Sequence, residues 1–494
     1  MGRNNGTLED LNSVICGKDY LGFFPTSNGT RPPHIANGLF RLCAGETCDT
    51  HDVHKWVLGE EKKNAYTSEQ IIEEYEDVLY HGHKEKTENV RDFRFLLGQI
   101  FNQDNTTYPS YDYSVVTQSS HWLIRERLSN EAYIGDFAYS ILSKRIEEQR
   151  SPAIDTIHDA LSVDTDDITR LVKPIIAYPS MKDKRHLQLY EKEERQDIPW
   201  DSCKEAIRKG FDRLTENLYS SGETKNSLLV LQRFVNYTMF ATLLYLSHAA
   251  SAIYDLPRPP ILIDAGCELE SIKKASEQSF TSAKKAVEDY YVYSVYTLLT
   301  SDKIENNDKA CKQWIEDMVI SGKKDDDTIR EAVKSYYSGF LANNDPPLMA
   351  LSKAVQLGLY TFTYKNNSPS DFCRVLGVRC GLVGPKGNTK HKRYTVDSFT
   401  LETIILSALS SQELKYGIDM KQFGDRLVDS YNILIGSNVE REYEILSNYN
   451  IAQSTPEDLR GDLGINAQKL AETLISLGLA KSYADGVTLV GWGL

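Results

Sequence analysis

The carboxy-terminal stretch, residues 454–494, constrains the fold of this chain more than any other part of its sequence. Thr455 is a good N-cap residue, and Pro456 suits the first position of a helix. Glu457 and Asp458 then place negative charge in the first turn, which the helix dipole favours. We expect Gly464 to break this short helix, because glycine interrupts helical patterns.

A second helix is expected between Asn466, which can cap it, and Leu477. Leu470, Leu474 and Leu477 repeat at positions i, i+4 and i+7, the spacing of one helix face. Gly478 follows at the position where a helix carboxyl terminus favours left-handed backbone. The two helices and the break between them therefore predict a helix-turn-helix.

Asp485-Gly486 predicts a β-hairpin, because this dipeptide is the strongest short hairpin signal and lies between residues 479–483 and 487–491. Helix, turn, helix and a two-stranded wing resemble the winged-helix family. The resemblance implies a three-helix core, to which an earlier helix must contribute. It also implies that the second helix enters the major groove in DNA-binding members. Gln468 and Lys469 are then the candidate base-contacting residues.

The charge of this module does not decide which ligand it binds. Three cationic side chains stand against five anionic ones between residues 456 and 494, namely Arg460, Lys469 and Lys481 against Glu457, Asp458, Asp462, Glu472 and Asp485. Phosphate contacts supply most non-specific DNA affinity, and they require cations. DNA binding, protein–protein docking and simple packing against the body of the protein therefore remain as alternatives.

The rest of the 494-residue chain predicts a mainly α, multi-domain protein. Helical segments are expected at 200–218, 225–254, 269–299, 308–320, 325–341 and 346–364, and residues 256–266 are expected to form a rigid bridge. The charged stretch 182–197 marks a linker. We expect a mixed or helical region at 1–180, a helical domain at 198–365, and a region at 366–494 that ends in the winged helix.

Composition and charge limit which partners the protein can bind and in which cell compartment we expect it. The net charge of −14 excludes a protein that is basic overall, so any nucleic-acid contact must come from a local patch. We see neither an amino-terminal signal pattern nor eighteen uninterrupted apolar residues, and we therefore expect a cytoplasmic protein with no membrane span. The eight cysteines are sparse for this length, and we expect them to be mostly reduced thiols.

The most basic short stretch is the loop from 384 to 393. Lys386, Lys390, Lys392 and Arg393 cluster there, and interleaved glycines make the loop flexible and expose backbone N–H groups. Both features predict contact with phosphate. The alternative is a solvated loop tip without a ligand.

Cys43, Cys48, His51 and His54 form the sharpest candidate metal site, because thiolates and imidazoles are the ligands that zinc prefers. Their spacing lacks the paired C-x2-C of familiar zinc fingers. The alternative is a polar surface loop with one or two buried thiols. A structural zinc ion is the one cofactor that the sequence suggests.

Catalytic motifs are scarce. His51-Asp52 and His158-Asp159, with His121 upstream, would suit a metal phosphohydrolase, but such dipeptides also occur as helix-surface pairs. We find neither a G-x-x-x-x-G-K-[ST] phosphate loop nor a G-x-S-x-G elbow.

We therefore expect a non-enzymatic subunit of an assembly that acts on nucleic acid, with other protein subunits as partners. The layout of residues 366–494 also resembles the tails of uncharacterised bacterial proteins encoded in anti-phage loci, which implies antiviral defence as a setting. The rival hypotheses are a metal-dependent hydrolase or nuclease with an unrecognised site, and a pure protein–protein scaffold.

If Cys43, Cys48, His51 and His54 bind zinc, elemental analysis of the purified protein will give about one zinc ion per chain. Replacing Cys48 with Ser removes one ligand, so metal content and local stability will both fall. Metal-free protein that is fully folded would contradict the site.

Overall fold

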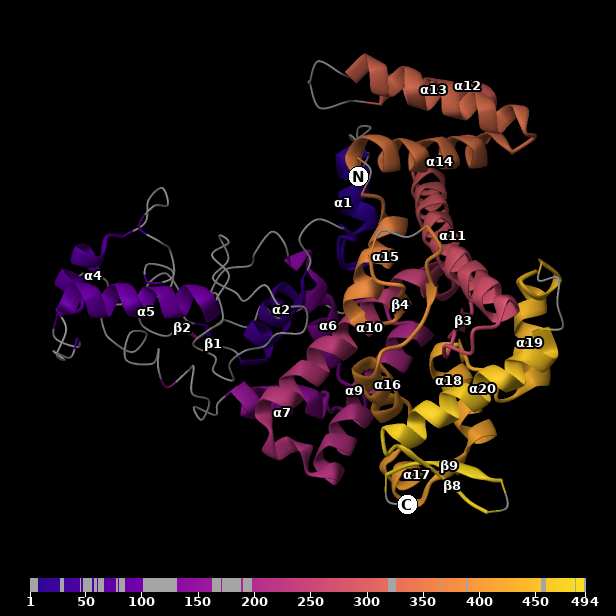
Figure 1. The fold of residues 1–494 in the computed structure, drawn as a ribbon. Helices are drawn as coiled ribbons and strands as arrows, with labels where there is room; N and C mark the ends of the chain where they lie inside the picture. Colours follow the sequence, from indigo (N-terminus) through magenta and orange to yellow (C-terminus); the bar gives the residue numbers. More distant parts are fainter. Residues whose placement is uncertain are drawn as a thin grey trace. The chain divides into compact units, whose positions relative to one another are not determined.

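The computed structural model describes residues 8–26, 31–44, 46–47, 56, 60, 66–76, 79, 85–100, 131–161, 170, 188–189, 198–318, 326–365, 367–387, 390–454, 459–484 and 486–492. Helices predominate and strands are few and short, which confirms the prediction of a mainly α protein. Figure 1 shows the helices and strands along the chain.

The chain forms two compact units. Unit 1 contains Met1–Gly29, Ile198–Arg213 and Phe240–Leu494, and unit 2 contains Thr30–Asp197 and Leu214–Met239. Helices α9 (Ser202–Ser221) and α10 (Ser227–Tyr254) each supply residues to both units. This grouping differs from the three predicted regions, because most of 198–365 packs with 366–494 in unit 1.

Unit 2 is a small helical body. Its named elements are α2 (Pro32–Ala44), β1 (Glu46–Thr47), α4 (Ser68–Glu74), α5 (Lys86–Ile100), α6 (Ile134–Ser143), α7 (Pro152–Leu161) and β2 (Gln188–Leu189). Helix α2 packs against α6 and α7. A Cβ atom on Gly135 would lie 2.3 Å from the carbonyl carbon of Gly38, so the two glycines allow the backbones of α2 and α6 to touch. Thr67 and Gln70 form a capping box at the start of α4.

Unit 1 is organised along a long helix, α11 (Glu270–Ser301), with α14 (Pro347–Gly358) near one end and α20 (Leu459–Ser476) near the other (Figure 1). Four more helical elements complete this part of unit 1: α12 (Asp308–Asp317), α13 (Asp326–Ala342), η4 (Leu359–Thr363) and α15 (Pro369–Cys380). Helix α1 (Leu8–Ile15) is held to α11, because the Tyr290 hydroxyl donates to the Ile15 carbonyl at 2.8 Å.

The remaining helices of unit 1 are α16 (Ser398–Ala408), α17 (Ser411–Tyr416), α18 (Met420–Tyr431), α19 (Val439–Asn448) and the short η5 (Ala452–Ser454). The strands of this unit form three small sheets among the described residues: β3 (Ile261–Leu262) with β7 (Ile433–Leu434), β4 (Val383–Gly384) with β5 (Arg393–Tyr394), and β6 (Ile418–Asp419), β9 (Thr488–Val490) and β8 (Ala480–Ser482) in that order. The β3–β7 pair is parallel and the other pairs are antiparallel. The expected bridge at 256–266 therefore contains a buried strand.

The predicted turn at Gly464 was wrong, because α20 runs without a break through this residue. Gly464 lies on the solvent side of the helix, where a Cβ atom would meet nothing within 4 Å. Glycine inside a helix costs only about 1 kcal/mol relative to alanine. Burial of Leu459, Leu463 and Leu470 on the inner face offsets this cost. The predicted cap at Thr455 and Pro456 lies outside the described residues.

The predicted hairpin is present. Strands β8 and β9 pair in antiparallel register, and the Tyr483 N–H donates to the Val487 carbonyl at 2.9 Å. Gly478 ends α20 in the left-handed conformation with φ of 73°, as the sequence indicated. Strand β6 adds a third strand to the free edge of β9, which the sequence did not indicate.

Helix α10 has the length and mean hydropathy of a membrane span. However, 78% of its most apolar window is buried inside the fold. A core helix of a globular protein has the same two properties.

Replacing Gly464 with Ala will stabilise the protein by about 1 kcal/mol, because alanine favours the interior of a continuous helix. Gly478→Ala is the matched control, since that site also has open space around a Cβ atom but has positive φ. This control will destabilise the protein by about 1 kcal/mol. The free energy of unfolding of both variants is measured by denaturant unfolding. Destabilisation by Gly464→Ala would contradict the continuous helix and favour a break at Gly464.

Candidate functional site

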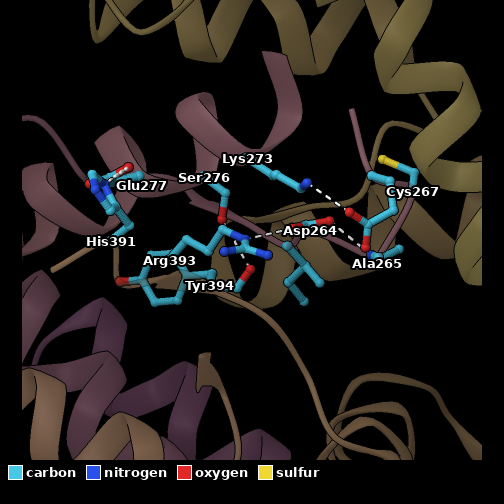
Figure 2. A network of polar contacts seen from close by, with 12 residues as sticks. Asp264, Ala265, Cys267, Lys273, Ser276, Glu277, His391, Arg393 and Tyr394 are labelled. Carbon is cyan, nitrogen blue, oxygen red and sulfur yellow. Dashed lines mark hydrogen bonds and ion pairs between the residues drawn. The ribbon is translucent and has the colours of Figure 1, made fainter. Parts of the chain in front are cut away.

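The predicted basic loop joins β4 and β5 and is anchored at its base by an ion pair (Figure 2). The Arg393 Nε donates to the Asp264 Oδ2 at 2.6 Å. Asp264 follows β3, and its side chain is only 1% exposed, whereas Arg393 is 22% exposed. The other carboxylate oxygen of Asp264 accepts from the Gly266 N–H at 2.8 Å. Arg393 is therefore bound mainly to the protein itself.

Three further contacts fix strand β5 and His391, which lies two residues before it (Figure 2). The Tyr394 carbonyl accepts hydrogen bonds from the Asp264 N–H at 2.9 Å and from the Ser276 hydroxyl at 3.0 Å. The His391 Nδ1 lies 3.0 Å from a carboxylate oxygen of Glu277 on α11. The hairpin is thus attached both to the β3 loop and to α11.

Lys392 is buried within its own loop. Its ammonium group donates to the Gly387 carbonyl at 2.8 Å and also to the Pro385 carbonyl. Burial lowers the pKa of Lys392, and the nearby charge of Arg374 acts in the same direction. Lys392 therefore shapes the loop and does not present its charge to solvent.

Only two of the four predicted phosphate-contacting cations are exposed. Lys386 and Lys390 lie on the two arms of the loop, on the solvent side. Among the described residues, no ion pair involves either of them. The sequence identified the cluster, but it did not distinguish the exposed lysines from the two cations that the protein binds internally.

A buried amide joins the loops that follow β3 and β7. The Asn466 side chain donates to the carbonyls of Ile263 and Ile435 at 2.8 and 3.0 Å. Its oxygen accepts from the Ala265 N–H at 2.9 Å. Asn466 was expected to cap a helix, and it instead lies inside α20, fully buried. Its position fixes the inner face of α20 against the parallel strand pair.

The loop after β7 is held by a buried carboxylate. Glu442 accepts backbone hydrogen bonds from Ile435 at 2.8 Å, Gly436 at 2.6 Å and Asn438 at 3.0 Å. Burial raises the pKa of Glu442, and these hydrogen bonds oppose the rise. Gly436 has φ of 90°, and a Cβ atom there would lie 1.9 Å from the Leu463 carbonyl oxygen, so α20 touches this loop directly.

The outer face of α20 carries the predicted base-contacting residues, and both are exposed. The Lys469 ammonium lies 2.9 Å from a carboxylate oxygen of Glu472 on the same helix. Ile465 and Ile475 are exposed on this face by 49% and 41%. Sequence reasoning missed the two isoleucines, although their positions fall outside the buried leucine face and could have been found by periodicity.

The hairpin that follows α20 is also partly apolar at its surface. Tyr483 is 40% exposed and Val487 is 42% exposed. The Lys481 ammonium lies 5.4 Å from the centre of the Tyr483 ring. We name these two hairpin side chains, together with Ile465 and Ile475, the α20–wing surface.

The predicted zinc site is only partly within the described residues. Cys43 is buried near the end of α2. Cys48, His51 and His54 lie outside the described residues. Within the described part of the chain, no group of three or more His, Cys, Asp or Glu side chains could hold a metal ion. The zinc site stays a prediction.

The other candidate groups have no catalytic arrangement among the described residues. His158 and Asp159 form an exposed pair at 3.5 Å on α7, whereas His121 and His51-Asp52 lie outside the described residues. Burial raises the pKa of the thiols of Cys16 and Cys203 to about 11 and about 12. Neither cysteine is a thiolate nucleophile at neutral pH.

Comparison with known proteins gives no relative: no family model, no curated protein and no solved structure matches this chain. The functional argument therefore rests on the contacts and exposed surfaces of the chain itself.

Replacing Arg393 with Met will destabilise the protein by about 2–3 kcal/mol, because the buried Asp264 carboxylate loses its cation. The double variant with Asp264→Leu will cost less than the sum of the two single changes, with a coupling of about 1–3 kcal/mol. Denaturant unfolding measures all three variants. Lys390→Met is the control and will stay within about 0.5 kcal/mol of the wild type. Additive single changes would show that the pair does not anchor the hairpin.

Proposed function

We propose that this chain is a non-catalytic, cytoplasmic subunit of an assembly that acts on nucleic acid, and that it docks a partner protein through the α20–wing surface. The observation that carries the proposal is the exposure of four large apolar side chains on two consecutive elements, α20 and the β8–β9 hairpin. A contiguous exposed apolar surface is typical of interaction sites, and we propose that these four side chains form one.

The inner face of α20 supports this role because its side chains bind the rest of unit 1. Asn466 binds the loops after β3 and β7, and the Ser271 hydroxyl donates to Asp462. Leu459 and Leu463 belong to a core cluster shared with α11, α18 and α19. A helix fixed in this way presents its outer face without further ordering, which lowers the entropic cost of association.

The charges of the outer face favour a protein partner over a DNA groove. Lys469 is the predicted base-contacting cation, and it is paired with Glu472. A DNA-reading helix needs free cations near phosphate, whereas Ile465 and Ile475 gain from burial against another protein. The core of a protein–protein interface is likewise depleted of charge.

A winged-helix arrangement of the carboxy-terminal module is part of the proposal. Helices α17 and α18 precede α20 and supply two earlier helices, and the β8–β9 hairpin follows α20 as the wing. The segment from β7 to α19 lies between α18 and α20, and α20 is one continuous helix. We propose that α20 and the wing act together as the docking element, in the bacterial antiviral setting that the sequence suggested.

The double variant Ile465→Glu/Ile475→Glu will lose the partner, because two carboxylates would be buried in the interface without counterions. The tagged full-length chain is purified from its own host, and co-purifying proteins are quantified by mass spectrometry. The matched control is Phe95→Glu/Leu96→Glu, which changes side chains on α5 that are 70% and 44% exposed. The partner will remain bound to this control.

A photo-crosslinking amino acid at position 475 identifies the contact directly, with position 95 as its control. The protein that crosslinks at position 475 will be the one that no longer co-purifies with Ile465→Glu/Ile475→Glu. The thermal unfolding temperature of this glutamate variant will stay near that of the wild type. Full retention of every co-purifying protein by Ile465→Glu/Ile475→Glu would refute docking through this surface.

A further inference from the structure

We propose that the β4–β5 hairpin contacts the phosphate backbone of duplex nucleic acid through Lys386 and Lys390, and that Lys392 and Arg393 are positioning residues for these two lysines. The proposal rests on the nucleic-acid part of the proposed function and deepens it, but it concerns different residues from those of the α20–wing surface. The two surfaces can therefore be tested independently.

The backbone around Lys386 is held on both sides. Lys392 donates to the carbonyls of Pro385 and Gly387, the residues directly before and after Lys386. Gly387 has φ of 95°, a conformation that favours glycine. One buried ammonium group therefore sets the direction from which the Lys386 side chain leaves the loop.

The backbone next to Lys390 is also held. His391 follows it and contacts Glu277 at 3.0 Å, and Arg393 binds Asp264 two residues further along. Lys390 thus lies in the loop just before β5, next to backbone that is attached to α11 and to the β3 loop. Both exposed lysines stand on anchored backbone, so binding a ligand costs little additional loop ordering.

A polyanion fits this arrangement better than a single small anion does. The two lysines lie on opposite arms of a surface loop, and the two neighbouring cations are occupied by carbonyl and carboxylate groups of the protein. Lysine contacts phosphate as a point charge and releases condensed counterions from a nucleic-acid duplex. In a chain with a net charge of −14, such contacts must be local, and this hairpin offers them.

The test measures equilibrium binding of the full-length protein to a fluorescent 20-base-pair DNA duplex at several salt concentrations. The variant Lys386→Gln/Lys390→Gln will flatten the slope of log affinity against log salt by about 1.8, since each phosphate contact contributes about 0.9. At low salt its affinity will fall by at least about tenfold. The matched control is Lys209→Gln/Lys312→Gln, which removes two lysines that are 64% and 60% exposed. This control will keep the wild-type slope.

Lys392→Met separates positioning from contact. This variant will bind DNA several-fold more weakly but keep most of the wild-type slope, because both contact lysines remain. Backbone NMR order parameters at residues 386 and 387 will fall in Lys392→Met and stay unchanged in Lys386→Gln/Lys390→Gln. Loss of slope in Lys392→Met equal to one full contact, with unchanged order parameters, would assign Lys392 to phosphate contact and overturn its positioning role.

Three outcomes would overturn the proposal as a whole. They are the absence of wild-type duplex binding at low salt, an equal slope change in the control variant, and binding to vesicles containing phosphatidylserine without binding to duplex DNA. The variant Ile465→Glu/Ile475→Glu will bind DNA like the wild type. Failure of docking through α20 and failure of phosphate contact through the hairpin are therefore distinguished.

Discussion

The buried Asn466 side chain is the interaction on which the carboxy-terminal half of unit 1 depends. Its hydrogen bonds join the loop after β3, the loop after β7 and helix α20. A buried amide that lacked these partners would cost several kcal/mol, so the three segments are constrained to one arrangement. Glu442 and Gly436 reinforce it, because the carboxylate organises the β7 loop and the glycine lets α20 approach.

These contacts between α20 and the loops after β3 and β7 explain why the two faces of α20 differ in their exposure to solvent. The inner face is bound by polar contacts and by a core cluster, whereas the outer face carries exposed isoleucines between polar residues. Hydrophobic burial alone would fix the helix less specifically, since apolar contacts are non-directional. The directional bonds of Asn466 hold the helix in register, and the orientation of its outer face is thereby fixed.

The hairpin β4–β5 shows how burial divides one cluster of like charges into different roles. Lys392 and Arg393 are bound by carbonyl oxygens and by Asp264, and Lys386 and Lys390 remain exposed. A buried cation must be paired or hydrogen-bonded, and such a group stabilises a loop shape. The two exposed lysines therefore stand on backbone that the two internally bound cations hold in place.

Local sequence determined most of the helices and the hairpin. Signals of this kind depend only on neighbouring residues. They include the apolar spacing of α9 to α14, the Thr67–Gln70 capping box, the turn at Asp485-Gly486 and the left-handed Gly478. Tertiary structure decided the rest. Whether Gly464 breaks a helix depends on burial of the opposite face, and whether Arg393 meets solvent depends on Asp264, which is far away in the chain. The parallel pairing of β3 with β7 likewise joins distant segments, because packing free energy and not local propensity brings them together.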